Sequence, residues 1–370
     1  MGRSQEVRSA LSIAVQAGIS VLLWGEPGVG KTSAIVGLAE SLGWNCEILI
    51  GSIRDATDFG GLPVRTERGV ELAAPSWATR ISEEHARGRR SLLFLDELTT
   101  AQPAVQAAML RIVLDRVAGD HVLPPDTAIV AAANPPETAA DGYDLAPPLA
   151  NRFCHLEWPV AASDWVTGMI AGWGNATFAR VPDDWSDGLP SWHASVAGFI
   201  NHRPDLLHFI PRDLTAQSRA WPSPRSWTMA TRLCAATAAT APQSSTMFEL
   251  LAGSVGEGAA TEFLTWLDAA DLPEPEAVLA DPTVLDLPMR GDRLFAVLGG
   301  VTGRVAADNT EERWNQGWAV LDTVVRSGQA DVAAVAARSL IALRHASWLL
   351  PETIDAFGPV LTSAGVLSHA

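Results

Sequence analysis

Short, mainly apolar runs alternate with amphipathic segments over the first part of the chain. The apolar runs lie at residues 21–24, 46–50, 91–95, 127–133 and 153–158, and apolar positions at helical spacing mark residues 5–17, 31–42, 75–87 and 103–115. Continuous rather than alternating apolar runs are typical of strands that are buried on both faces. Their alternation with helices predicts an α/β domain whose parallel sheet is covered by helices on both sides.

Two polar interruptions and one long helical region complete the pattern. Residues 55–74 contain Gly60, Gly61 and a turn at Arg68-Gly69, which predicts a β-hairpin inserted after the second strand, and residues 116–125 predict a second, shorter hairpin. Past residue 159 the strand signal ends, and helical patterns continue on both sides of a Pro-rich linker near residues 272–275, among them 293–306, 312–326 and 332–345. We expect three domains: 1–159 (αβα), 160–272 (all helical) and 273–370 (a helical extension).

The first predicted strand leads into a glycine-rich loop. Its sequence, Gly25-Glu26-Pro27-Gly28-Val29-Gly30-Lys31-Thr32, fits the phosphate-binding pattern G-x-x-x-x-G-K-[ST]. Glycines let successive backbone N–H groups point at phosphate oxygens, and the following helix adds its positive N-terminal end. Lys31, the only lysine in the sequence, would reach the terminal phosphates, and the Thr32 hydroxyl would bind Mg²⁺. The alternative interpretation is a chance glycine turn.

Acidic and amide side chains follow two further predicted strands. Asp96 and Glu97 come directly after residues 91–95, and Asn134 comes directly after residues 127–133. Asp96 would hold Mg²⁺ through its water shell, Glu97 would polarise the attacking water, and Asn134 could touch the terminal phosphate or that water. The structural alternatives are a helix cap for Asp96 and an Asx turn before proline for Asn134. The residues expected to bind nucleotide are Gly25, Glu26, Pro27, Gly28, Val29, Gly30, Lys31, Thr32, Ser33 and Asp96.

Two arginines are candidates for phosphate contacts. Arg152 lies in the sequence LANRF, and Arg225, in PSPRSW, opens a predicted helix. A guanidinium fork can stabilise the charge of a transferring phosphoryl group, from the same chain or from a neighbour. An ion pair with Glu157 is the alternative for Arg152, and Arg212, Arg219 and Arg232 compete with Arg225 for its role.

Composition and charge exclude several classes of protein. A net charge of −16 and a pI near 4.9 argue against a generic nucleic-acid binder, which would carry a basic face. Cys46, Cys154 and Cys234 are too far apart for a C-x-x-C zinc site or a disulfide framework. No apolar run reaches the length of a membrane span, and the first residues lack the apolar core of a signal peptide, so we expect a cytoplasmic location.

The order of these motifs resembles that of AAA+ ATPases. GEPGVGKT, LLFLDE, AAANPPE, LANRF and PSPRSW correspond to Walker A, Walker B, sensor 1, the arginine finger and sensor 2. The hairpin expected after the second strand is similar to the insert of the helix-2-insert group, and within it the chain resembles MoxR and dynein-related ATPases. The resemblance covers residues 1 to about 270 and implies a P-loop core followed by an all-α lid.

The resemblance also implies an assembly and a function. ATP and Mg²⁺ would bind between subunits of a homo-oligomer, usually a hexameric ring, with Arg152 entering the neighbour's site and Arg225 linking the lid to the phosphates. The first hairpin would face the pore or a partner. Family members commonly act as chaperone-like machines that remodel a protein client, often with a partner carrying a von Willebrand factor A domain. The alternatives are an ATP-binding switch or scaffold with little turnover and, against the acidic composition, a nucleic-acid motor.

Overall fold

The chain divides into two compact units. The computed structural model describes residues 3–67, 69–135, 145–171, 177–240 and 244–358. Unit 1 comprises Met1–Asp183 and His208–Ala260, and unit 2 comprises Asp184–Leu207 and Thr261–Ala370. The domain boundaries at residues 159 and 272 stay predictions.

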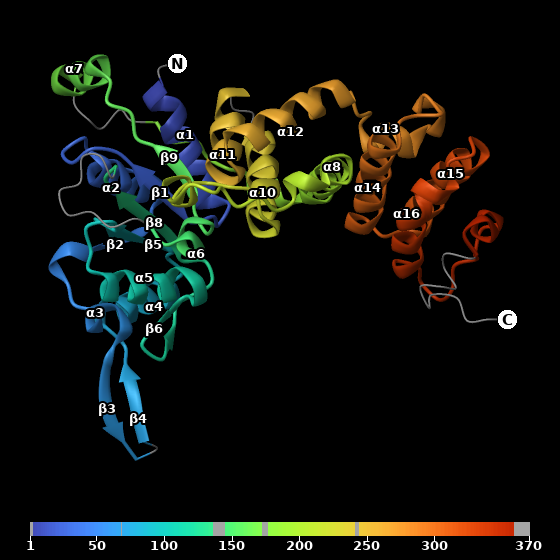
Figure 1. Cartoon of the computed structure of the whole chain (residues 1–370). Coiled ribbons are helices and arrows are strands. Elements are labelled where there is room, and N and C mark those ends of the chain that lie inside the picture. Colours follow the sequence, from blue (N-terminus) through green and yellow to red (C-terminus); the bar gives the residue numbers. More distant parts are fainter. Residues whose placement is uncertain (1–2, 68, 136–144, 172–176, 241–243, 359–370) are drawn as a thin grey trace. The chain divides into compact units, whose positions relative to one another are not determined.

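Unit 1 is built on a five-stranded parallel sheet in the order β2-β5-β8-β1-β9 (Figure 1). Every apolar run singled out in the sequence is one of its strands, and all four strand pairings are parallel. The predicted fold class, a parallel α/β core followed by a helical region, is therefore confirmed. The strands are β1 (Val21–Trp24), β2 (Asn45–Ile50), β5 (Ser91–Asp96), β8 (Ala128–Ala133) and β9 (Cys154–Glu157).

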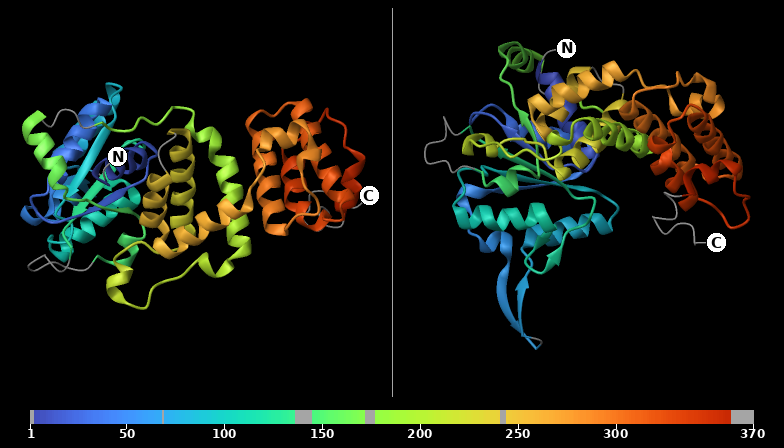
Figure 2. Two further views of the ribbon diagram at one scale, coloured as in Figure 1. Left: turned by 90° about the horizontal axis from the view of Figure 1, so that it is seen from above. Right: turned by 45° about the vertical axis from the view of Figure 1, so that its right-hand side comes forward.

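Helices cover both faces of this sheet (Figures 1 and 2). One face carries α1 (Arg3–Gln16) and α2 (Lys31–Leu42), and the other carries α4 (Ser76–Ala86) and α5 (Pro103–Asp115). Alternate strand residues such as Leu22, Leu93 and Ile129 belong to one apolar core with α4 and α5. β1, β8 and most of β5 are buried, which explains why their sequences are apolar without alternation.

Both predicted hairpins are present. β3 (Leu62–Thr66) and β4 (Gly69–Ala73) form an antiparallel ribbon that follows the short helix α3 (Thr57–Gly60) and projects from unit 1 (Figure 1). β6 (Val117–Ala118) and β7 (His121–Val122) form the shorter one. The two are joined at the base of the ribbon, where the N–H of Leu72 donates to the carboxylate of Asp120 (2.7 Å) and the Asp120 N–H donates to the Leu72 carbonyl (3.1 Å).

The remaining helices of unit 1 come largely from the second half of the chain. α10 and α11 pack against each other and against α1, and α11 also lies on β9. The last helix, α12, passes from unit 1 into unit 2. These helices are α6 (Pro147–Ala150), α7 (Ala162–Ala171), α9 (Leu214–Gln217), α10 (Pro224–Thr240), α11 (Ser244–Val255) and α12 (Glu257–Ala270).

Unit 2 is helical throughout the residues described. Its members are α8 (Leu189–His202), α13 (Pro275–Ala280), α14 (Gly291–Ala307), α15 (Glu311–Arg326) and α16 (Ala330–Ala342), so the three helices expected near the C-terminus are confirmed. α8 and α14 approach closely because Gly299 faces Ala194: a Cβ on Gly299 would lie 2.5 Å from that of Ala194. Among the described residues of the chain, no helix is both long and apolar enough to span a bilayer.

Candidate functional site

The ends of β5, β8 and β1 form one edge of the sheet in unit 1. These strands are neighbours, with Trp24 beside Ala133 and Leu95 beside Ala131. The N–H of Gly25 continues this pairing by donating to the Ala133 carbonyl (3.2 Å). Residues that follow the three strands therefore meet at the carboxyl edge, where parallel sheets with helices on both faces bind their ligands.

The loop after β1 has the conformation that its glycines predict. Gly28 and Gly30 have φ angles of 81° and 87°, in the left-handed region that favours glycine. A Cβ on either residue would meet no atom within 4 Å, so the loop borders open space. The loop is held from outside by Trp158, whose indole N–H donates to the Val29 carbonyl (3.3 Å). It ends at the first residue of α2, whose N-terminal N–H groups favour an anion.

Lys31 is buried at the start of α2, with 8% of its surface exposed. Its ammonium group donates to the carbonyls of Gly25 (2.5 Å) and Glu26 (3.0 Å) and to Oδ1 of Asn134 (3.2 Å). Burial lowers the pKa of this amine, and the negative charges of Asp96 and Glu97 oppose that shift. Lys31 thus connects the loop after β1 to Asn134, the residue that follows β8. The role of Asn134 as a phosphate sensor stays a prediction.

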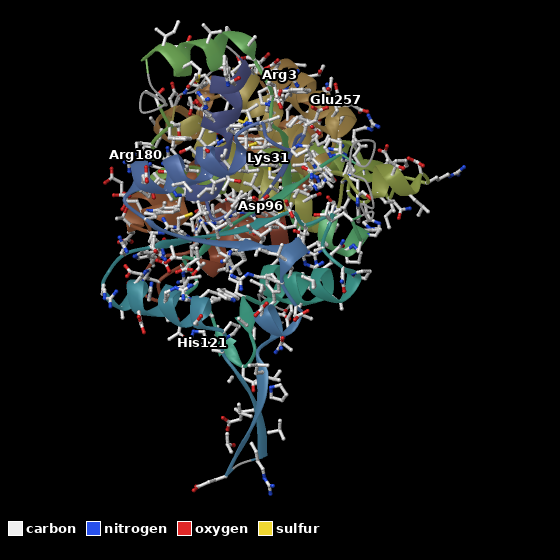
Figure 3. All side chains as sticks on the ribbon, turned by 90° about the vertical axis from the view of Figure 1, so that its left-hand side faces the viewer. Arg3, Lys31, Asp96, His121, Arg180 and Glu257 are labelled. Atoms are coloured by element: carbon white, nitrogen blue, oxygen red, sulfur yellow. The ribbon has the colours of Figure 1, made fainter. Side chains whose placement is uncertain are left out.

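Thr32 and Asp96 form the second contact across this edge. The Thr32 hydroxyl donates to Oδ2 of Asp96 (3.0 Å), while Oδ1 of Asp96 accepts the N–H of Glu97 (2.9 Å). Figure 3 labels Lys31 and Asp96, which come from α2 and β5. Asp96 does not cap the next helix, because α5 begins only at Pro103 with Gln102 before it. The helix-cap alternative for Asp96 is therefore excluded.

Glu97 has an unusual backbone and a partner that the sequence did not suggest. Its φ angle is 57°, a left-handed conformation that costs energy for a residue with a side chain and recurs at functional sites. Its carboxylate accepts a hydrogen bond from the hydroxyl of Ser52, just after β2. The sequence signal that could have identified Ser52 as a site residue is its position, because it is a polar residue shortly after a predicted strand. Recognising it required the adjacency of β2 and β5 in the sheet.

Arg152 and Arg225 both belong to unit 1, and the charge of one is felt by the other. Arg152 follows α6, and its guanidinium donates to the Pro148 carbonyl. Arg225 stands in the first turn of α10. Burial lowers the pKa of Arg152, and the positive charge of Arg225 lowers it further, which is the repulsion expected of neighbouring cations. The alternative partner of Arg152 is otherwise occupied, because Glu157 pairs with Arg219 (2.5 Å).

Two of the arginines that compete with Arg225 have other partners. Arg219 also stacks on the ring of Trp24, with its guanidinium carbon 3.9 Å from the ring centroid. Arg232 donates to the Ala17 carbonyl (2.6 Å), next to the end of α1. These contacts engage Arg219 and Arg232 elsewhere, and they do not decide between Arg225 and Arg212. The role of Arg225 in nucleotide binding stays a prediction.

The donor set fits a nucleotide triphosphate with Mg²⁺. The loop offers open space bounded by backbone N–H groups, Lys31 offers a positive charge, and Thr32 and Asp96 offer the hard oxygen atoms that Mg²⁺ prefers. Ser33, the next residue of α2, is exposed at the same end of the helix. In the described residues no group of three or more His, Cys, Asp and Glu side chains is placed to hold a metal ion by itself.

One comparison with known proteins bears on the family of this region. Residues 20–153 match the family model of the AAA domain (dynein-related subfamily), a span from the start of β1 to the residue after Arg152. No curated protein matches the sequence. Among solved structures, the chain is similar to the crystal structure of a candidate ATPase from Cytophaga hutchinsonii, with 16% identity, coverage of 67% of this chain and 80% of that chain, and a TM-score of 0.43. A structural likeness at that level does not bear on function.

The family match and the fold support an AAA+ ATPase domain in the first part of the chain. The match covers the phosphate-binding loop, Asp96, Glu97, Asn134 and Arg152, and it ends before Arg225. It also supports nucleotide binding at the family level. The assignment to the MoxR group and the roles of the individual side chains stay predictions.

Proposed function

We propose that the chain is the subunit of a ring-shaped ATPase that couples ATP hydrolysis to the remodelling of a protein client. One observation carries the proposal: three separate stretches of sequence converge at one edge of the sheet, and their side chains Lys31, Thr32, Asp96, Glu97 and Asn134 contact one another in pairs. A scaffold that only binds nucleotide has no need for Glu97, whose left-handed backbone is maintained at an energetic cost.

Each side chain of the site then has a role set by its chemistry. Lys31 and the loop after β1 hold the phosphates, Thr32 and Asp96 hold Mg²⁺, and Asn134 orients the terminal phosphate or the attacking water. Mg²⁺ supplies positive charge that polarises the phosphoryl oxygens. Glu97 orients the water and accepts its proton once its carboxylate has exchanged Ser52 for that water. The resting bond to Ser52 supports a site that is inactive until it rearranges.

The arginines lead us to propose an oligomer. A pair of neighbouring guanidinium groups suits an anion with several charges, and a transferring phosphoryl group is such an anion. We propose that Arg152 enters the nucleotide site of the next subunit. Because the charge of Arg225 acts on Arg152, we propose that both arginines serve that same nucleotide. By analogy with AAA+ rings, we propose a homo-oligomer of six subunits.

The projecting hairpin supports a contact with a client or a partner. Leu62 and Val70, one on each strand of the ribbon, are 60% and 73% exposed. Isolated two-stranded ribbons are marginally stable, and Asp120 braces this one at its base. We propose, by analogy with the MoxR group, that this ribbon contacts a protein client or a von Willebrand factor A domain partner, and that the protein acts in the cytoplasm as a chaperone.

The test of the proposal is ATP-dependent assembly of Glu97→Gln. This variant keeps its hydrogen-bonding shape but loses the base, so we expect it to bind Mg-ATP without turnover. Native mass measured with and without Mg-ATP should shift from a small species to a ring. Lys31→Ala is the control and should neither bind nor assemble. An unchanged small species that still hydrolyses ATP would refute the ring, and wild-type nucleotide affinity in Lys31→Ala would refute the loop assignment.

A further inference from the structure

Asn151, the residue before Arg152, is a buried amide with two partners. Only 4% of its surface is exposed. Its side-chain N–H donates to the carbonyl of Trp221 (3.0 Å), and its oxygen accepts the hydroxyl of Ser223 (2.6 Å). Both partners lie more than 69 residues further along the chain, directly before α10. The amide therefore ties the turn after α6 to the beginning of the helix that carries Arg225.

Ser223 is itself the cap of α10. The N–H of Ser226 donates to the Ser223 hydroxyl (3.1 Å), and the N–H of Ser223 donates to the Ser226 hydroxyl (2.9 Å). This reciprocal pair satisfies N–H groups that the first turn of a helix leaves without an intrahelical partner. Since Arg225 lies between the two serines, its backbone position is fixed by the same cap that Asn151 holds.

A second buried side chain holds the turn from the other direction. His155 of β9 donates to the Ala150 carbonyl (2.9 Å) and accepts the indole N–H of Trp24 (2.9 Å), the residue before the phosphate-binding loop. Burial lowers the pKa of His155 to about 4, so the imidazole is neutral and can donate from one nitrogen while it accepts at the other. Hydrogen bonds thus run from the end of β1, through the turn after α6, to the cap of α10.

We propose that Asn151 is a positioning residue that holds Arg152 and Arg225 side by side, so that the two guanidinium groups reach a neighbouring subunit's nucleotide together. The inference rests on the proposed function. The two guanidinium groups repel each other, and long side chains are flexible. Both groups can therefore contact one nucleotide only if the backbones that carry them are held in place. An amide suits the position because it donates to one carbonyl and accepts one hydroxyl without adding charge. Leucine can do neither, and aspartate would introduce a buried anion beside both arginines.

The test is rescue between subunits. Asn151→Leu should fold and bind the non-hydrolysable analogue AMP-PNP with wild-type affinity, because its own phosphate-binding loop is unchanged. Its ATPase kcat should fall about 10- to 100-fold, the loss expected when catalytic groups are misplaced by about 1 Å. Mixing it with Glu97→Gln should restore activity, since the Glu97→Gln subunit supplies correctly held arginines and the Asn151→Leu subunit supplies an intact Glu97.

Three comparisons make the outcome decisive. Ser218→Ala is the matched control: it removes another buried hydrogen bond, from the Ser218 hydroxyl to the Leu145 carbonyl (3.2 Å), and should leave kcat near that of the wild type. Lys31→Ala mixed with Glu97→Gln should not recover, because both defects fall in one site. Ser223→Ala removes the partner of Asn151 and should be rescued by Glu97→Gln as Asn151→Leu is.

Failure of the inference differs from failure of the proposed function. If wild-type protein does not hydrolyse ATP, or if Arg152→Ala is not rescued by Glu97→Gln, the proposed function or its geometry between subunits is wrong, and the inference falls with it. If Arg152→Ala is rescued but folded Asn151→Leu is fully active, or is inactive and not rescued, Asn151 does not act through the arginines.

Discussion

Replacement of the buried His155 should change how the stability of unit 1 depends on pH. In the folded chain its pKa is lowered to about 4 from an ordinary 6.5, chiefly because burial disfavours the charged imidazolium. Between about pH 4 and pH 6.5, His155 therefore binds a proton in the unfolded chain but not in the folded chain. The stability contributed by neutral His155 is fully present above about pH 6.5 and is lost as the pH falls towards about 4.

The size of the effect follows from the shift. One pKa unit corresponds to about 1.4 kcal/mol, so the interval from 6.5 to about 4 corresponds to about 3 kcal/mol in total. About two-thirds of this should already be lost near pH 5, where the unfolded imidazole is almost fully protonated and the folded one is not. A loss of this size is a large fraction of the stability of an ordinary domain.

His155→Gln removes the titrating group and keeps a side chain that can accept from Trp24 and donate to Ala150. We expect its free energy of unfolding to be lower than that of the wild type near neutral pH but to fall by about 2 kcal/mol less between about pH 7.5 and pH 5. Urea denaturation followed by tryptophan fluorescence at each pH measures both. His208→Gln, a change at an exposed histidine of the same unit, is the control. Equal pH slopes in His155→Gln and the wild type would contradict the burial argument.

Two further variants test the regulation of the site and the packing behind it. Ser52→Ala frees the Glu97 carboxylate and should raise basal kcat about 10- to 100-fold, because hydrogen bonds to charged groups contribute about 1.5–3 kcal/mol. An unchanged or lower kcat at unchanged nucleotide affinity would show that this bond does not restrain Glu97. Gly253→Ala places a Cβ 2.2 Å from the His155 carbonyl oxygen, where α11 lies on β9, and should destabilise unit 1 by about 1–3 kcal/mol. Gly258→Ala, whose Cβ meets no atom within 4 Å, should be neutral or stabilising, and equal melting temperatures of the two variants would refute the packing argument.

Local patterns were sufficient for the fold but not for the contacts between distant segments. Mainly apolar runs predicted all five strands of the sheet, and turn residues predicted both hairpins, because these signals depend on neighbours in the sequence. The bond between Ser52 and Glu97 depends on β2 lying beside β5, and the bond between Asn151 and Ser223 joins residues 72 positions apart. The close packing of α8 on α14 is of the same kind, since it results from small residues more than a hundred positions apart.

The residues of the candidate site could be predicted from the sequence because each of them follows a predicted strand. A glycine loop, Asp96-Glu97 and Asn134 each directly follow a predicted strand, and parallel strands bring such residues to one edge. What the sequence could not supply was the direction of each side chain: Asn134 towards Lys31, Glu97 towards Ser52, and Arg152 beside Arg225. The catalytic assignments among these residues stay predictions for the variants above.

The burial of Lys31 gives the molecule a built-in chemical reporter. Lys31 carries the only side-chain amine of the sequence, and it is 8% exposed. Acylation of lysine side chains can therefore modify a single position, Lys31, which lies at the end of the phosphate-binding loop. The extent of labelling at Lys31, read from the mass of its peptide and so separated from the N-terminal amine, reports how far the loop is open. Surface attachment through this lysine would disable the site that it was meant to display.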